Sequence, residues 1–204
     1  MNSAKMCKNE KNSKKIGYIV INTFANNTYE QFKKQVESLE EKNINGLIID
    51  VRGNSGGYLH SVTNMLDIFL PKGSIIYQIQ DKKGVTKYKS SSMASRNYPV
   101  AVLVDKSSAS ASEILAVAFK ESYNADVIGT STYGKGTVQT TKNLNSGGMI
   151  KYTIQKWLSP KGNWVNGIGV EPTIKEALNE QYEKEPTESN DNQLQKAIDV
   201  ISNK

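Results

Sequence analysis

The sequence predicts an α/β domain built on a mainly parallel sheet, with βα crossovers covered by helices, and a small β-rich C-terminal part. Two observations indicate this class. Between Gly46 and Gly129, short apolar runs alternate with stretches of helical periodicity, which is the pattern of βα crossover units. The apolar runs are continuous rather than alternating, which is typical of strands buried on both faces. The 204 residues, 37% of them hydrophobic, suffice for one domain with a core.

The chain is expected to begin with a disordered polar tail, residues 1–15, which holds much of the net charge of +6. A lysine-rich end is usually solvated, and no arginine–aromatic patch accompanies it, so nucleic acid is not an expected partner. The single cysteine, Cys7, lies in this tail and excludes an intrachain disulfide. Nothing around Cys7 indicates the pocket that a nucleophile needs.

The first half of the domain shows strand and helix patterns in alternation. Phe32, Val36 and Leu39 recur on one helical face, whereas Ile16–Phe24 alternates and is β-branched. The expected elements, in order, are a strand Ile16–Phe24, a helix from Thr28, a strand Gly46–Val51, a helix Leu59–Phe69 and a hairpin of Ser74–Gln80 with Thr86–Lys89.

The second half continues the alternation and then becomes β-rich. The expected elements are a strand Pro99–Asp105, a helix Ser110–Ser122, strands Ala125–Gly129, Thr137–Thr141 and Ile150–Leu158, a further strand around Trp164–Val170, and a short terminal helix Gln193–Ile201. The core is therefore expected over residues 16–175, and residues 176–204 are expected to form a C-terminal extension.

Three loops qualify as ligand sites, because ligands of open α/β sheets lie beyond the carboxyl ends of the strands. These loops are Arg52–Gly57, Lys106–Ser110 and Thr130–Gln139. All contain small residues or glycine, which let a substrate approach the backbone.

The segment Lys106–Ser112 (KSSASAS) places serines at a strand-to-helix junction. The amides of a helix N-terminus can stabilise a developing oxyanion, so a nucleophile is well placed there. The same residues also fit a structural role, because Ser110 with Glu113 forms the pattern of a capping box. Local pattern alone does not choose the nucleophile among Ser107, Ser108, Ser110 and Ser112.

A serine nucleophile needs a base, and two candidates stand out. His60 is the only histidine, and its place in a helix is typical of a half-exposed residue. Lys135 lies between two glycines with no other charge nearby, and a lysine can act as base where burial favours its neutral form. Gly129–Gly136 also nearly matches a phosphate-binding loop, but Gly136 replaces the Ser or Thr, and a strand pattern follows where a helix is required.

Four segments resemble, in order, the signature blocks of the C-terminal processing (tail-specific) peptidases. They are Gly46–Leu59, Val102–Ala116, Tyr133–Gln139 and Trp157–Thr173. Asp191–Ile198 also resembles the usual ending of this family, so the resemblance covers nearly the whole chain. It implies a fold with a ClpP/crotonase-like core.

The resemblance also implies roles for individual residues. Ser110 would be the nucleophile, Lys135 the base and Gln139 the residue that orients the lysine. The oxyanion hole would be formed by the amide of Ala111 and by the amide of a glycine in the loop Arg52–Gly57, with Gly56 favoured over Gly57. The implied activity is that of a serine endopeptidase cleaving protein or peptide substrates near extended C-termini, through an acyl-enzyme and without metal or cofactor.

The chain also departs from the family pattern. Members usually carry a PDZ domain, a module that binds peptide C-termini, before the strand that Ile16 begins, whereas here fifteen polar residues precede it. A catalytically weak or inactive peptide-binding core is therefore the alternative, and homo-oligomer formation stays open. No signal peptide or membrane segment is visible, so the chain as written is expected to be soluble and cytoplasmic. Family members are mostly extracytoplasmic, so a longer parent could be exported.

Overall fold

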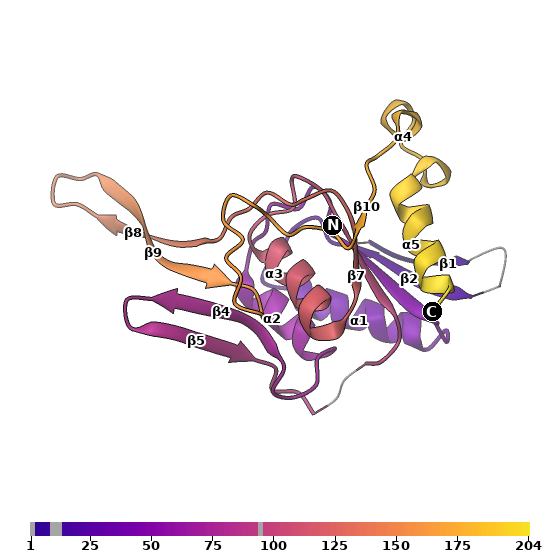
Figure 1. Ribbon diagram of the computed structural model, residues 1–204, viewed down its shortest axis with the longest axis horizontal. Coiled ribbons are helices and arrows are strands. Elements are labelled where there is room, and N and C mark those ends of the chain that lie inside the picture. Colours follow the sequence, from indigo (N-terminus) through magenta and orange to yellow (C-terminus); the bar gives the residue numbers. More distant parts are fainter. Residues whose placement is uncertain (1–2, 9–13, 94–95) are drawn as a thin grey trace.

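The computed structural model describes residues 3–8, 14–93 and 96–204 (Figure 1). Its centre is a six-stranded sheet of order β1-β2-β3-β6-β7-β10. The strands are β1 (Ser3–Lys8), β2 (Lys15–Val20), β3 (Gly46–Asp50), β6 (Val100–Val104), β7 (Asp126–Gly129) and β10 (Ile174–Lys175). β1 runs antiparallel to β2, and every other neighbouring pair in this sheet is parallel. The predicted class, α/β with a mainly parallel sheet, is confirmed.

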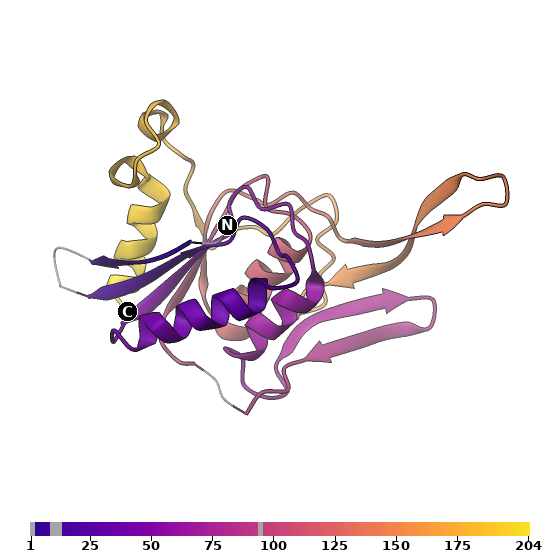
Figure 2. The ribbon, with the colours of Figure 1, turned by 180° about the vertical axis from the view of Figure 1, so that it is seen from behind.

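Helices cover both faces of this sheet, as Figure 2 shows for α1 and α5. In β3, Leu47 and Ile49 face the core of α1–α3, whereas Ile48 faces α5, because side chains alternate along a strand. This explains why the sequence of β3 is apolar throughout. The helices are α1 (Thr28–Glu40), α2 (Leu59–Asp67), α3 (Ala111–Ala118) with a π-helical turn (Phe119–Tyr123), α4 (Glu180–Lys184), a 3-10 turn (Glu188–Asn190) and α5 (Asn192–Ser202).

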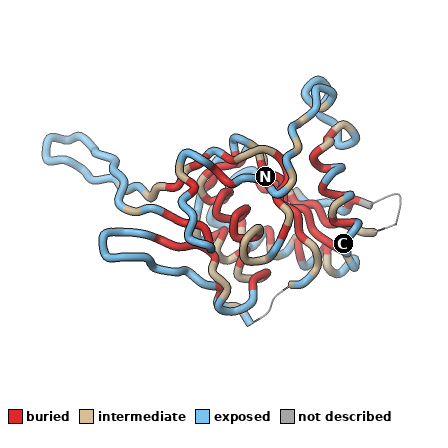
Figure 3. Tube along the Cα trace, in the orientation of Figure 1, coloured by how far each residue is buried: buried red, intermediate tan, exposed pale blue. Residues whose placement is uncertain are grey.

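A second, four-stranded antiparallel sheet has the order β5-β4-β9-β8. It consists of two hairpins, β4 (Ile75–Asp81) with β5 (Gly84–Lys89), and β8 (Thr137–Asn143) with β9 (Met149–Leu158). The hairpins pair where Gln78–Gln80 lies opposite Lys156–Leu158. Their outer parts project from the body on one side and are exposed (Figures 1 and 3).

Two expectations are corrected. Residues 3–8 of the supposed disordered tail form β1, and Cys7 is buried there; residues 1–2 and 9–13 lie outside the described part. The segment 164–170 is not a strand, since beyond one bridge between Leu158 and Trp164 it forms turns. The expected short terminal helix is present as α5, and it supplies the apolar cover of one sheet face.

No helix in the described ranges is both long and apolar enough to cross a membrane.

Candidate active site

A cleft of about 270 Å³ opens at the carboxyl edge of the parallel sheet, where the body meets the two hairpins. Four of the five expected site residues line it: Ser110, Ala111, Lys135 and Gln139. The fifth, Gly56, is buried directly behind it, and its neighbour Gly57 lines the cleft. The remaining walls are largely apolar, formed by Leu59, Tyr77, Ile79, Ile114, Val138 and Trp157.

Ser110 lies at the junction between β6 and α3, in a backbone conformation with φ +55° and ψ −113°. A non-glycine residue at such a positive φ is strained, and strained turns often present a nucleophile. The neighbouring serines have other roles, because Ser108 Oγ donates to Val51 O and Ser112 Oγ to Asn54 O. The structure therefore separates Ser110, which lines the cleft, from serines that hold the turn Arg52–Gly57 (the glycine turn) in place.

Two residues that line this cleft, Ala111 and Gly57, have backbone amides with no acceptor among the described residues. Ala111 begins α3, so its N–H is one of those that a helix leaves unpaired. In the bridge between the glycine turn and Phe24, the bonds use Gly56 O and Tyr58 N, which leaves the Gly57 N–H pointing away from Phe24. The Gly56 N–H, in contrast, already donates to Asn54 Oδ1 at 2.8 Å.

Gly56 nevertheless lies against Ser110. A Cβ added there would lie 2.8 Å from Ala109 O, 3.0 Å from Ser110 Cβ and 3.1 Å from Ala111 N. Only glycine fits this position, which also has φ +107°.

The loop that carries Lys135 is fixed through its main chain. Lys135 N donates to Glu113 Oε2 at 2.9 Å, and Lys135 O accepts from Trp157 Nε1 at 2.6 Å. The next carbonyl, of Gly136, accepts from Trp164 Nε1 at 2.9 Å. The backbone is thus held on both sides, and the half-buried Lys135 side chain lines the cleft.

Glu113 connects Ser110 to the loop that carries Lys135. Its fully buried carboxylate accepts from Ser110 N at 2.8 Å, Lys135 N at 2.9 Å, Gly134 N at 2.7 Å and Thr132 Oγ1 at 2.6 Å. The Ser110 bond is the glutamate half of the expected capping box. The other three bonds come from a loop about twenty residues further along the chain, which local pattern could not reveal.

The side-chain functional groups of the site are less tightly joined. Within the described part of the chain, no hydrogen bond links Ser110 Oγ to Lys135 Nζ, or Gln139 to Lys135. All three residues line one cleft, but they do not form a closed hydrogen-bonded chain. In enzymes without bound substrate, catalytic hydrogen bonds are often long and tighten only in the complex.

A buried ionic network anchors the glycine turn from below. The Arg52 guanidinium donates to Asp50 Oδ2 at 2.6 Å and to Asp191 Oδ2 at 2.7 Å, and Tyr18 OH donates to the same Asp50 oxygen at 2.7 Å. Burial alone would lower the pKa of Arg52, but the hydrogen bonds to both carboxylates raise it above its usual range. The turn is thereby tied to Asp191, the N-cap of α5.

The other candidate groups lie elsewhere. His60 is exposed on α2, with its ring 3.2 Å from Asn64, and does not line the cleft. The near-match to a phosphate loop is followed by β8 rather than by a helix, so it lacks the helix N-terminus that binds phosphate. Burial, together with Glu188, raises the pKa of the Cys7 thiol to about 12, which makes it a poor nucleophile.

The chain belongs to peptidase family S41, whose model matches residues 15–176. This is the family of serine-type C-terminal processing peptidases that the motifs indicate, so the expected membership is confirmed.

Named relatives agree. The chain is 50% identical over 160 residues to the carboxy-terminal processing protease CtpB of Bacillus subtilis strain 168, covering 78% of this chain and 33% of that protein. It is 39% identical over 164 residues to CtpA of the same strain, covering 80% and 35%. The chain thus spans about a third of the length of these curated relatives. Among solved structures, it is similar to a photosystem II D1 C-terminal processing protease, with a TM-score of 0.79 and 28% identity over 86% of this chain and 48% of that one.

Proposed function

We propose that this chain is the catalytic core of a serine endopeptidase that cleaves proteins near their C-termini through a Ser110–Lys135 dyad. One observation carries the proposal: a strained serine, a half-buried lysine and two unpaired amides line the same cleft. The names of the relatives, which are carboxy-terminal processing proteases, supply the expected class of substrate.

In the proposed mechanism, Ser110 Oγ attacks the scissile carbonyl while the neutral Lys135 amine takes the hydroxyl proton. Lys135 then gives this proton to the leaving amine, and an acyl-enzyme on Ser110 remains. Lys135 next takes a proton from water, which attacks the ester carbonyl, and returns this proton to Ser110 Oγ as the ester C–O bond breaks and the acid product leaves. Substrate covering the apolar walls would exclude water, which disfavours the charged form of the lysine.

The tetrahedral oxyanion would be held by the amides of Ala111 and Gly57. We assign the second donor to Gly57 rather than to the initially favoured Gly56, because the Gly56 N–H already donates to Asn54. Gly56 would instead provide the close approach of the turn to Ser110. Removing one such donor typically lowers kcat about 10²–10³-fold.

The test is the purified chain with Ser110→Ala or Lys135→Ala, measured on an unstructured protein substrate and on peptides with free C-termini. Each change should lower kcat about 10⁴-fold or more, because members of a catalytic unit act together. Ser107→Ala and Lys106→Ala are matched controls, since both residues are exposed neighbours in the same segment. Circular dichroism checks that the variants fold, and full activity in either dyad variant would refute the mechanism.

A non-catalytic peptide-binding core is the second candidate, favoured by the missing hydrogen bond between Ser110 and Lys135. The two candidate functions are distinguished by treating the protein with a serine-directed phosphonate and measuring the mass of the intact protein. A catalytic core gains one phosphonyl group, and Ser110→Ala does not. A binding core shows no adduct while it still binds extended peptides.

A further inference from the structure

The two hairpins carry an unbalanced positive charge. Their strands and turns, 75–89 and 137–158, contain one aspartate, Asp81, and seven lysines: Lys82, Lys83, Lys87, Lys89, Lys142, Lys151 and Lys156. Their formal charge of +6 equals that of the whole chain, so the rest of the molecule is balanced.

These charges are exposed and available to a ligand. All seven lysines are exposed, and no ion pair involving any of them occurs in the described ranges. One of them, Lys156, lies over the Trp164 ring at 4.1 Å from its centroid. Asp81 uses its carboxylate to accept from Lys83 N within the turn.

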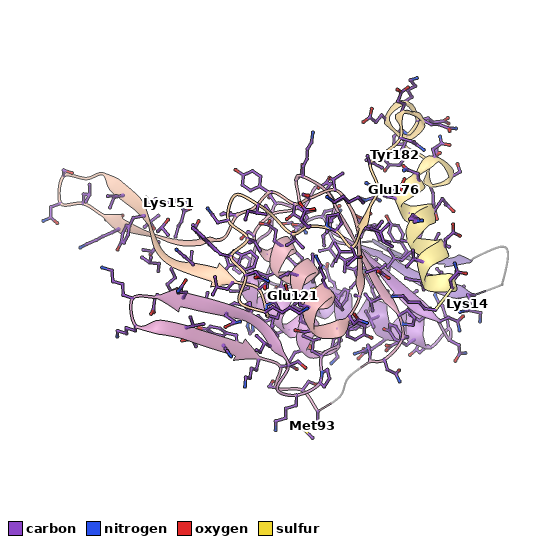
Figure 4. The ribbon with its side chains drawn as sticks, in the orientation of Figure 1. Lys14, Met93, Glu121, Lys151, Glu176 and Tyr182 are labelled. Atoms are coloured by element: carbon purple, nitrogen blue, oxygen red, sulfur yellow. The ribbon has the colours of Figure 1, made fainter. Side chains whose placement is uncertain are left out.

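One of these lysines faces the candidate active site. Lys151 lies on β9 of the projecting hairpin (Figure 4) and lines the same cleft as Ser110 and Lys135. It shares a strand face with Thr153, the register partner of Gln139, because alternate side chains point the same way. Ile150, Tyr152 and Ile154 occupy the opposite face. The charged residues that line the cleft are therefore two lysines and no carboxylate.

We infer that the hairpins form a basic rim that selects acidic peptide segments as substrates, with Lys151 pairing with a carboxylate a few residues from the cleaved bond. This inference rests on the proposed peptidase function and names the substrate class of its site. Lys135 would meet the scissile bond, and the rim would attract and orient the acidic flank.

The charge pattern also predicts how the preference for acidic substrates depends on ionic strength. An exposed ion pair changes affinity by about twofold to fivefold, and salt screens it. Several unpaired charges of one sign mainly raise the rate of encounter. The preference for acidic substrates should therefore be largest at low ionic strength.

The experiment compares kcat/KM for pairs of fluorogenic peptides that differ only in Glu against Gln, placed at each of five positions on either side of the cleaved bond. We expect the wild-type chain to favour glutamate at one or two adjacent positions, and Lys151→Gln to lower that ratio about threefold, within the range of one exposed pair. Lys82→Gln/Lys83→Gln should lower the acidic preference at low salt across all positions. Lys196→Gln on α5, exposed on the opposite side of the sheet, should leave every ratio unchanged.

The outcomes separate this inference from the proposed function. Normal cleavage with equal Glu/Gln ratios, or ratios that survive Lys151→Gln, would overturn the basic rim and leave the peptidase standing. If no peptide is cleaved, the dissociation constants of the same peptides, measured by fluorescence anisotropy, decide: tighter binding of the Glu peptide that Lys151→Gln removes supports the rim. Lysine-dependent sedimentation with anionic phosphatidylglycerol vesicles, without any peptide preference, would assign the hairpin charges to a lipid surface and refute the proposal.

Discussion

The two sides of the cleft are built very differently. The Ser110 side, around Ser110 and the turn Arg52–Gly57, is held by buried contacts: Glu113 is fully buried, Arg52 bridges two buried carboxylates, and Ser112 holds the turn. The hairpin side, which carries Gln139 and Lys151, is exposed and extends away from the body (Figure 3). Lys135 lies between them: its N–H donates to Glu113 on the first side, its carbonyl accepts from Trp157 of β9, and its side chain lines the cleft.

The difference indicates that the two sides of the cleft have different roles. Groups that hold the oxyanion and nucleophile must be fixed to a fraction of an ångström, which packing and satisfied hydrogen bonds provide. Groups that meet a variable substrate can lie on elements with few buried contacts, which is where local motion concentrates. Substitutions on the two sides should therefore differ in how strongly stability and activity change together.

The largest effect is expected for Glu113→Ala. The variant leaves four donors without their acceptor, and each buried unmatched group costs about 1–3 kcal/mol. After partial relaxation, we expect about 4 kcal/mol less free energy of unfolding by urea titration. We also expect kcat to fall at least about 10²-fold, because Ser110 and Lys135 lose their common anchor.

Glu37→Ala is the matched control for this change. Glu37 is an exposed glutamate of α1, 4.0 Å from Lys33, and its loss should cost about 0.3 kcal/mol. Equal behaviour of the two variants would show that the buried carboxylate does not couple the nucleophile to the lysine loop.

A pair of glycine substitutions sharpens the comparison. At Gly56→Ala the added Cβ meets Ala109 O and Ser110 Cβ at φ +107°, so we expect a loss of about 3 kcal/mol together with most of the activity. At Gly147→Ala, in the tip of the β8–β9 hairpin, φ is +85° but no atom lies within 4 Å, so we expect about 1 kcal/mol and near-normal kcat. Thermal unfolding and peptide assays measure the stability and activity of both variants. A larger loss of either quantity for Gly147→Ala than for Gly56→Ala would contradict the proposed difference between the two sides.

The sequence predicted the fold around Ser110 well for a physical reason. Buried strands such as β3 and β6 have continuous apolar runs, and a strand-to-helix junction has its own capping pattern, so local residues determine local structure. The same reasoning missed β1, because the composition of this segment is polar and only its pairing with β2 buries Cys7. It also assigned a strand to 164–170, where the Trp164 indole instead donates to Gly136 O.

The contacts between segments far apart in the sequence could not be predicted from local sequence patterns. The capping box identified Glu113 only as a partner of Ser110, and its bonds to Thr132, Gly134 and Lys135 require the loop to fold back over α3. Likewise, nothing near Lys151 in the sequence indicates that it lines the cleft, since this depends on the register of β8 with β9.

The smallest stability effect is expected for Gln139→Ala, which tests the hairpin side directly. Gln139 is exposed and follows a register irregularity between Val138 and Gln139, a kind of distortion that often re-aims a side chain. Its loss should change the free energy of unfolding by no more than about 0.5 kcal/mol.

If Gln139 orients the Lys135 amine in the substrate complex, Gln139→Ala should lower kcat about tenfold and leave KM close to its original value. This size corresponds to the loss of one hydrogen bond to a charged or reacting group. Thr140→Ala, whose side chain lies on the other face beside Tyr152, should change neither quantity. A normal kcat for Gln139→Ala would mean that the exposed hairpin does not position the lysine, and that the buried Glu113 side alone sets the geometry of Ser110 and Lys135.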